Sequence, residues 1–162
     1  MKTALKFVAL VATAHAVTYL ISGIVGQRLL GLHDFYPPSQ HALSYLRDPL
    51  SAHVQTWVWP AQLTRGVLFG LVLLPFRSRI GALGQLRGGL AVTSLLFVVS
   101  YLAAAGGLIE HLVFFSEYPF RFAALTAVEI VLHTAMLGQW IAWREAKSLS
   151  RGAEPRLAVR ST

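Results

Sequence analysis

The sequence predicts an all-α integral membrane protein, an up-down bundle of four transmembrane helices with both termini in the cytoplasm. Of its 162 residues, 55% are hydrophobic and only 13% are charged, about half the charged share of a typical soluble protein. The mean hydropathy of +0.57 agrees. A bilayer-spanning helix needs roughly 20 mostly apolar residues. Four windows meet this need, at about 4–30, 57–76, 90–109 and 122–143.

The first window begins like a cleavable signal peptide. Two lysines precede it, and Ala14-His15-Ala16 fits the A-x-A cleavage pattern. The apolar run continues past this point to Val25, which is too long for the apolar core of a signal peptide. We therefore expect an uncleaved transmembrane helix.

The connections between the windows are short or rich in helix breakers. Pro37-Pro38 and Asp48-Pro49 interrupt a long polar loop after the first window. A tight basic turn is expected over 77–89, and a second short turn over 110–121. These breaks predict one transmembrane domain over 1–143, followed by a polar, basic, frayed tail over 144–162.

The distribution of basic residues predicts the orientation. Arg28, Arg47 and Arg121 fall on one side of the predicted spans, and Arg65 lies within a span. The other ten basic residues share the opposite side, which the positive-inside rule makes cytoplasmic. They are Lys2, Lys6, Arg77, Arg79, Arg87, Arg144, Lys147, Arg151, Arg156 and Arg160.

Small residues indicate where the helices approach one another. Gly66-x-x-x-Gly70 lies in the second window, and Ser100-x-x-x-Ala104 and Ala103-x-x-x-Gly107 lie in the third. Such spacings let helix backbones pack closely in lipid. They predict one compact bundle with the small faces inward.

Four ionisable residues interrupt the apolar windows: His15, Arg65, Glu129 and His133. Each is a functional-site hypothesis, because a charge at bilayer depth is costly unless it is paired or hydrated. With a helix rise of about 1.5 Å per residue, Arg65 and Glu129 both lie roughly 10–12 Å below the outer surface. We expect them to form an ion pair, with Gln62 as a hydrogen-bonding neighbour.

The two histidines are expected near the middle of the bilayer, with His133 one turn below Glu129 on the same helix face. Glu110 and His111 end the third window at the outer mouth. Together with the Arg65–Glu129 level, these residues predict a polar pocket that opens outward. The cytoplasmic halves of the spans are apolar, so the pocket is expected to be blind.

Several functions remain open for such a pocket. Binding of a partner or a small ligand is the preferred interpretation, and proton-coupled or small-solute transport is the main alternative, since Glu and His can relay protons. His15 and His133 could also be axial haem ligands or bind a divalent metal, although no cofactor is predicted. A purely structural polar core is a further possibility. No catalytic motif is recognised, so an enzyme is not expected.

Composition limits the partners. The absence of cysteine excludes thiolate metal sites and cysteine catalysis. The net charge of +7 follows the membrane topology and forms no basic and aromatic nucleic-acid surface. The lipid bilayer is the expected partner, with anionic headgroups at the basic tail. A homo-oligomer or another membrane partner is also compatible.

The run from Arg65-Gly66 to Pro75-Phe76-Arg77 resembles a segment of a group of small bacterial membrane proteins that have no assigned activity. In that group, an Arg-Gly pair opens an apolar helix that ends in Pro, a hydrophobic residue and Arg. The resemblance implies a bacterial inner-membrane protein of four spans. It implies no activity and assigns no functional residue.

Overall fold

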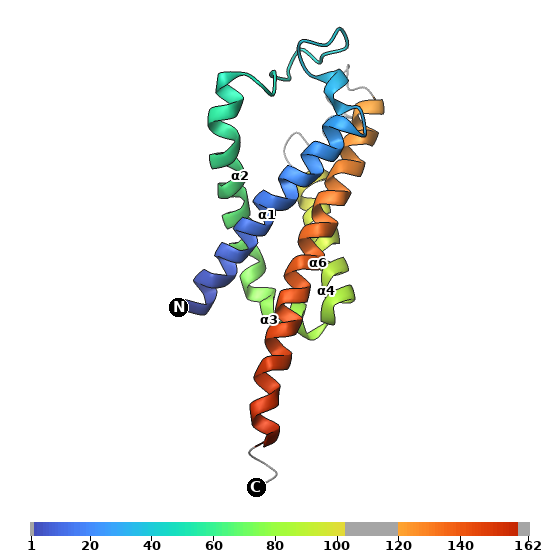
Figure 1. The fold of residues 1–162 in the computed structure, drawn as a ribbon. Coiled ribbons are helices and arrows are strands. Elements are labelled where there is room, and N and C mark those ends of the chain that lie inside the picture. The colour runs from blue at the N-terminus through green and yellow to red at the C-terminus, as the bar shows by residue number, and fades with distance from the viewer. Residues whose placement is uncertain (1, 103–119, 159–162) are drawn as a thin grey trace.

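The computed structural model describes residues 2–102 and 120–158 and is helical throughout, with no β-strand in these ranges. Four long helices run in alternating directions (Figure 1). Both termini of the chain lie at one end, which we call the base, and the connection over 29–51 lies at the other, which we call the loop end. The four helices are α1 (Lys2–Arg28), α2 (Ala52–Leu73), α4 (Gly84–Phe97) and α6 (Phe120–Ala158).

The prediction of four spans is confirmed to the extent that four helical segments are long and apolar enough to cross a membrane: Thr3–Arg28, Ala52–Ala82, Gly84–Leu102 and Phe120–Ser150. The second helix begins five residues before the expected 57, because Ser51 caps it. The Ser51 hydroxyl accepts a hydrogen bond from the Val54 amide at 3.4 Å. The expectation from hydropathy alone overlooked this polar first turn.

The structure corrects the prediction of a turn over 77–89, because most of these residues are helical. A 3₁₀ turn (Leu74–Phe76) leads into the short helix α3 (Arg77–Ala82), and α4 starts directly afterwards. The chain reverses at Leu83 and Gly84, where Gly84 has φ of 75°. Only glycine adopts this conformation without strain. The other glycines of this stretch serve helix packing.

The structure also corrects the prediction of a frayed tail after residue 143. Helix α6 continues past Trp143 to Ala158. Residues 144–149 are mostly good helix formers, and no Gly or Pro occurs before Gly152. The apolar window marks the part of the helix that suits a bilayer, whereas the helix itself continues into the polar residues that follow.

Helix α1 lies between α2 and α6, and α4 packs on α6 (Figure 1). The second-window motif packs as expected. A Cβ added at Gly66 would lie 2.7 Å from Ala12 Cα, and one at Gly70 would lie 2.9 Å from Val8 Cα. The backbones of α1 and α2 therefore touch along this motif. The two motifs of the third window extend into residues outside the described part of the chain.

The base holds the main apolar core, which is contributed by α1, α2, α3, α4 and α6. Its buried members are Phe7, Val11, Ala14, Leu73, Ile80, Val92, Leu96, Leu137, Ile141 and Ala142. A salt bridge ties α3 to α6 beside this core, with Arg77 Nε 2.5 Å from Glu145 Oε2. The Arg77 guanidinium also lies 5.4 Å from the ring centre of Phe7 on α1. The sequence analysis did not anticipate this bridge.

The loop end has a smaller core of its own. A 3₁₀ turn (Leu32–Phe35) follows α1, and Leu32 and Phe35 pack against Phe122 at the start of α6. Arg121 lies 3.8 Å from Asp34 across the same contact. The loop is thereby fixed to α1 and α6, and it carries Tyr36 toward the space between the helices.

Candidate functional site

The two buried histidines are in direct contact. His15 on α1 is 1% exposed and His133 on α6 is 8% exposed. His133 Nε2 lies 3.1 Å from His15 Nδ1, and the rings meet nearly edge to face with their centres 4.8 Å apart. The sequence placed these residues at a common depth. The crossing of α1 and α6 brings them together.

Gln62 extends this contact to a third helix. Its Oε1 on α2 lies 3.1 Å from His15 Nε2, so Gln62, His15 and His133 form one hydrogen-bonded chain. If the Gln62 carbonyl accepts, His15 Nδ1 is the acceptor for the Nε2–H of His133. If the Gln62 amide is flipped, its NH₂ group donates to His15 Nε2, and His15 Nδ1–H donates to His133 Nε2. In both cases the chain ends at His133 Nδ1.

That last atom is one of two buried polar atoms without a hydrogen-bond partner in the described part of the chain. The other is Thr126 Oγ1, two turns away on α6. Buried polar atoms are satisfied in the great majority of cases, and each exception requires an explanation. Both residues belong to the wall of a polar cavity.

The cavity has a volume of about 200 Å³ and lies between helices that are far apart in the sequence. Its walls combine charged, aromatic and hydroxyl side chains with little aliphatic surface. The lining residues are His15, Tyr19, Ser22, Tyr36, Arg65, Phe69, Ser100, Thr126, Glu129, Ile130 and His133.

Arg65 and Glu129 both line this cavity, but the expected ion pair between them is not among the salt bridges of the described residues. Equal depth did not bring the side chains together, because α1 lies between the helices that carry them. Arg65 is exposed on α2, and Glu129 is partly buried on α6. The two opposite charges therefore face one space without neutralising each other directly.

Glycines on α1 make room for the Glu129 carboxyl group. A Cβ added at Gly26 would lie 2.8 Å from Glu129 Cδ, and one at Gly23 would lie 3.9 Å from Oε1. The carboxyl group thus packs against the backbone of α1. A larger residue at Gly26 would displace it from the cavity wall.

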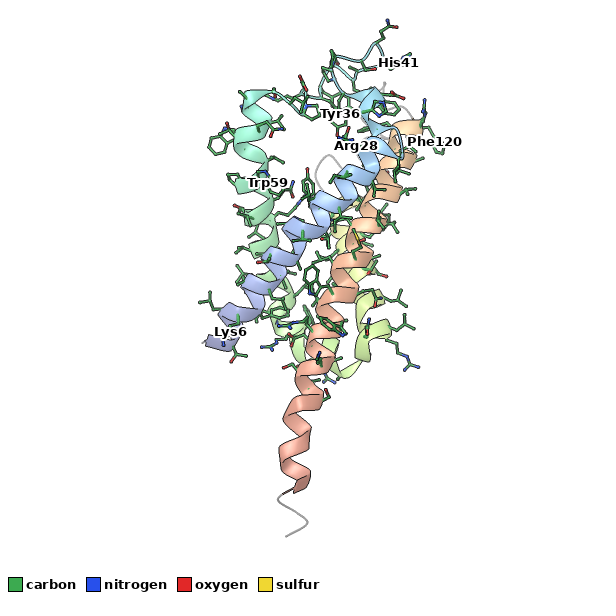
Figure 2. The ribbon with its side chains drawn as sticks, viewed as in Figure 1. Lys6, Arg28, Tyr36, His41, Trp59 and Phe120 are labelled. Atoms are coloured by element: carbon green, nitrogen blue, oxygen red, sulfur yellow. The ribbon has the colours of Figure 1, made fainter. Side chains whose placement is uncertain are left out.

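A second cavity of about 400 Å³ adjoins the first at the loop end. The two share Tyr19, Tyr36 and Glu129 in their walls, so they are neighbouring spaces. The second is lined by the outer halves of α1 and α2, including Arg28 and Trp59, which Figure 2 labels together with Tyr36. We call this second cavity the vestibule.

Tyr36 connects the two spaces and was not among the predicted residues. Burial raises its pKa from 10.0 to about 12, and the charge of Glu129 acts in the same direction. The phenol is therefore neutral at ordinary pH and can donate a hydrogen bond. A tyrosine beside two prolines in a polar loop gives no signal of this role in the sequence.

Three other residues were predicted for the site, namely Gln62, Glu110 and His111. Gln62 joins the hydrogen-bonded chain. Glu110 and His111 lie outside the described residues.

The haem alternative would place iron between His15 and His133. Two axial haem ligands must lie on opposite faces of the porphyrin with iron between them. The direct hydrogen-bond contact of His15 and His133 leaves no such space. Among the described residues, no group of three or more His, Cys, Asp or Glu side chains could hold a metal ion.

Toward the base, the cavity meets the apolar core. Phe69 packs edge-on against His15, with ring centres 5.1 Å apart, and Leu73 and Leu137 of the core are at most 1% exposed. Apolar side chains therefore bound the cavity on the side of the base. The vestibule lies on the other side, where Pro49 and Gln55 near the loop end contribute to its wall.

Comparisons of the chain with models of protein families, with curated proteins and with solved structures find no match.

Proposed function

We propose that this protein is a multi-pass protein of a bacterial inner membrane that binds a small polar ligand in the cavity between α1, α2 and α6. In this proposal both termini are cytoplasmic and the loop end faces outward. The distribution of basic residues supports the orientation, because α3 and the first turns of α1 and α4 lie at the base and carry Arg77, Lys6 and Arg87 (Figure 1). They would also contact anionic lipid headgroups there.

One observation carries the ligand-binding proposal. Three helices bring a buried histidine pair and two opposite, separated charges to one cavity, whose wall contains two unsatisfied polar atoms. A polar core that served structure alone would satisfy these groups internally. Here two side-chain atoms in residues of the cavity wall have no internal partner, and Arg65 and Glu129 line the same cavity without a salt bridge among the described residues.

The proposal is tested by thermal unfolding of the purified protein in detergent, with a panel of small polar solutes of each charge type. A solute that binds the folded state raises the midpoint, and above its Kd the stabilisation grows with the logarithm of the solute concentration. Stabilisation that is lost in Glu129→Gln and kept in Leu63→Ala, an exposed position outside the cavity, would support the site. Absence of any response across the panel would contradict it.

Proton transport is the second candidate, because the Gln62–His15–His133 chain is a path along which protons could move. An amide does not titrate, so the chain ends at Gln62. Ligand binding therefore agrees better with the geometry. Proton flux into liposomes distinguishes the two, since a flux that Glu129→Gln abolishes would favour transport.

A further inference from the structure

The charges of the cavity indicate which chemical class of ligand it takes, an inference that rests on the proposed function. Arg65 and Glu129 face the same space from different helices, and neither has a salt bridge among the described residues. An isolated charge in a low-dielectric setting is unfavourable unless an opposite charge or water compensates it. A ligand that carries both signs would compensate both side chains at once.

The aromatic residues of the cavity are suited to the positive group. Tyr19 and Tyr36 line both the cavity and the vestibule beside Glu129. Aromatic faces attract cations, and together with a carboxylate they form the usual recognition site for substituted ammonium groups. Tyr36 contributes here as a neutral phenol, since its pKa is about 12.

The guanidinium of Arg65 is suited to the negative group. Arginine binds carboxylate and phosphate oxygens with two parallel hydrogen bonds. Arg65 lies on α2, which packs against α1, so its position relative to Glu129 on α6 is set by the helix packing at Gly66 and Gly70. The pocket thus holds a cationic and an anionic subsite at separate places.

We propose that the ligand is a small zwitterion, with its ammonium group between Glu129 and the two tyrosines and its carboxylate or phosphate at Arg65. The size of the cavity supports a small molecule. Its volume of about 200 Å³ is below the roughly 300–1,000 Å³ of pockets for drug-sized ligands. The vestibule, with Arg28 and Gln27 at the loop end, is the route of entry.

The test compares four probes on the intact protein in detergent: glycine betaine, tetramethylammonium, acetate and glycerol. Binding is measured by calorimetry at constant ionic strength. We expect glycine betaine to bind at least about tenfold more tightly than tetramethylammonium or acetate, because only it engages both subsites.

Two charge-removing variants assign the subsites. In Glu129→Gln, glycine betaine should bind no more tightly than acetate, and in Arg65→Gln no more tightly than tetramethylammonium. The control Leu63→Ala should behave as wild type. The comparison of probes on the wild-type protein stands even if a variant fails to fold.

The outcomes separate this inference from the proposed function. Preference for a singly charged or uncharged probe, or unchanged binding of glycine betaine in Glu129→Gln, would overturn the zwitterion and leave a polar ligand site in place. Binding of none of the four probes would overturn the zwitterion, and a lack of response across the wider solute panel would overturn the proposed function as well.

Discussion

The base and the loop end of this molecule treat their polar residues in opposite ways. At the base, Arg77 and Glu145 meet at 2.5 Å beside a dense apolar core. At the loop end, Arg65 and Glu129 line one cavity without meeting. An arginine and a glutamate thus form a salt bridge at one end, whereas at the other end an arginine and a glutamate line a pocket. The comparison indicates that pairing, and not mere presence of charge, separates structural from ligand-facing polar groups.

The largest expected effect comes from a comparison of Glu145 with Glu129, which both lie on α6. Glu145→Ala leaves the partly buried Arg77 guanidinium without its carboxylate partner and should cost about 2 kcal/mol, below the penalty for a fully buried ion pair because the Arg77 side chain is 25% exposed. Glu129→Ala should cost less than about 1 kcal/mol, because no salt bridge is lost. Unfolding in detergent measures both, and equal losses would break the comparison.

A double variant sharpens this result. Arg77→Met with Glu145→Leu replaces the pair by apolar side chains and should recover at least half of the stability that Glu145→Ala loses. If stability does not recover, the salt bridge contributes more to the fold than the mutual neutralisation of Arg77 and Glu145.

The glycine crossing of α1 and α2 should give the next largest effect. In Gly70→Val, the new Cβ would lie only 2.9 Å from Val8 Cα, which is closer than packed atoms normally approach. This clash should destabilise the fold by about 1–3 kcal/mol. Val67→Leu, at a position that is 40% exposed on the same helix, is the matched control. Equal melting temperatures for the two variants would argue against close packing.

Alkaline titration tests the environment of Tyr36. Because burial raises its pKa from 10.0 to about 12, the protonated phenol favours the folded state, and this contribution is lost as pH rises between these values. The loss amounts to about 1 kcal/mol at pH 11. Absorbance of ionised tyrosine should show a late-titrating group that Tyr36→Phe removes. An unchanged titration curve in this variant would show that Tyr36 is exposed to water.

The histidine contact should give the smallest effect on stability. In a double-mutant cycle with His15→Leu and His133→Leu, the coupling free energy should be about 1 kcal/mol, the usual net value of a hydrogen bond. A cycle with no coupling would indicate that the two rings interact only by packing.

The sequence predicted the helices and part of the site for physical reasons that can be named. Hydropathy identifies segments that suit lipid, and helix rise alone placed His15 and His133 at one depth, where α1 and α6 cross. Depth does not tell which helices are neighbours. Among the described residues no salt bridge joins Arg65 and Glu129, and α1 lies between α2 and α6, which carry them.

Other features depend on tertiary contacts that have no local signal. Glu145 lies beyond the apolar window of α6, and its partner Arg77 is 68 positions away in the chain, so the bridge could not be read from spacing. Tyr36 reaches the cavity only because Leu32 and Phe35 fix the loop against α6.

Cysteine accessibility tests most directly whether the polar cavity is reached by water from the loop end. The chain has no cysteine, so single replacements are unambiguous probes. A charged, membrane-impermeant thiol reagent added from the outside should label Arg65→Cys, an exposed position of the cavity wall, and Arg47→Cys in the loop, and should leave Leu137→Cys in the base core unmodified. Labelling of Arg47→Cys without Arg65→Cys would contradict an open pocket at the loop end.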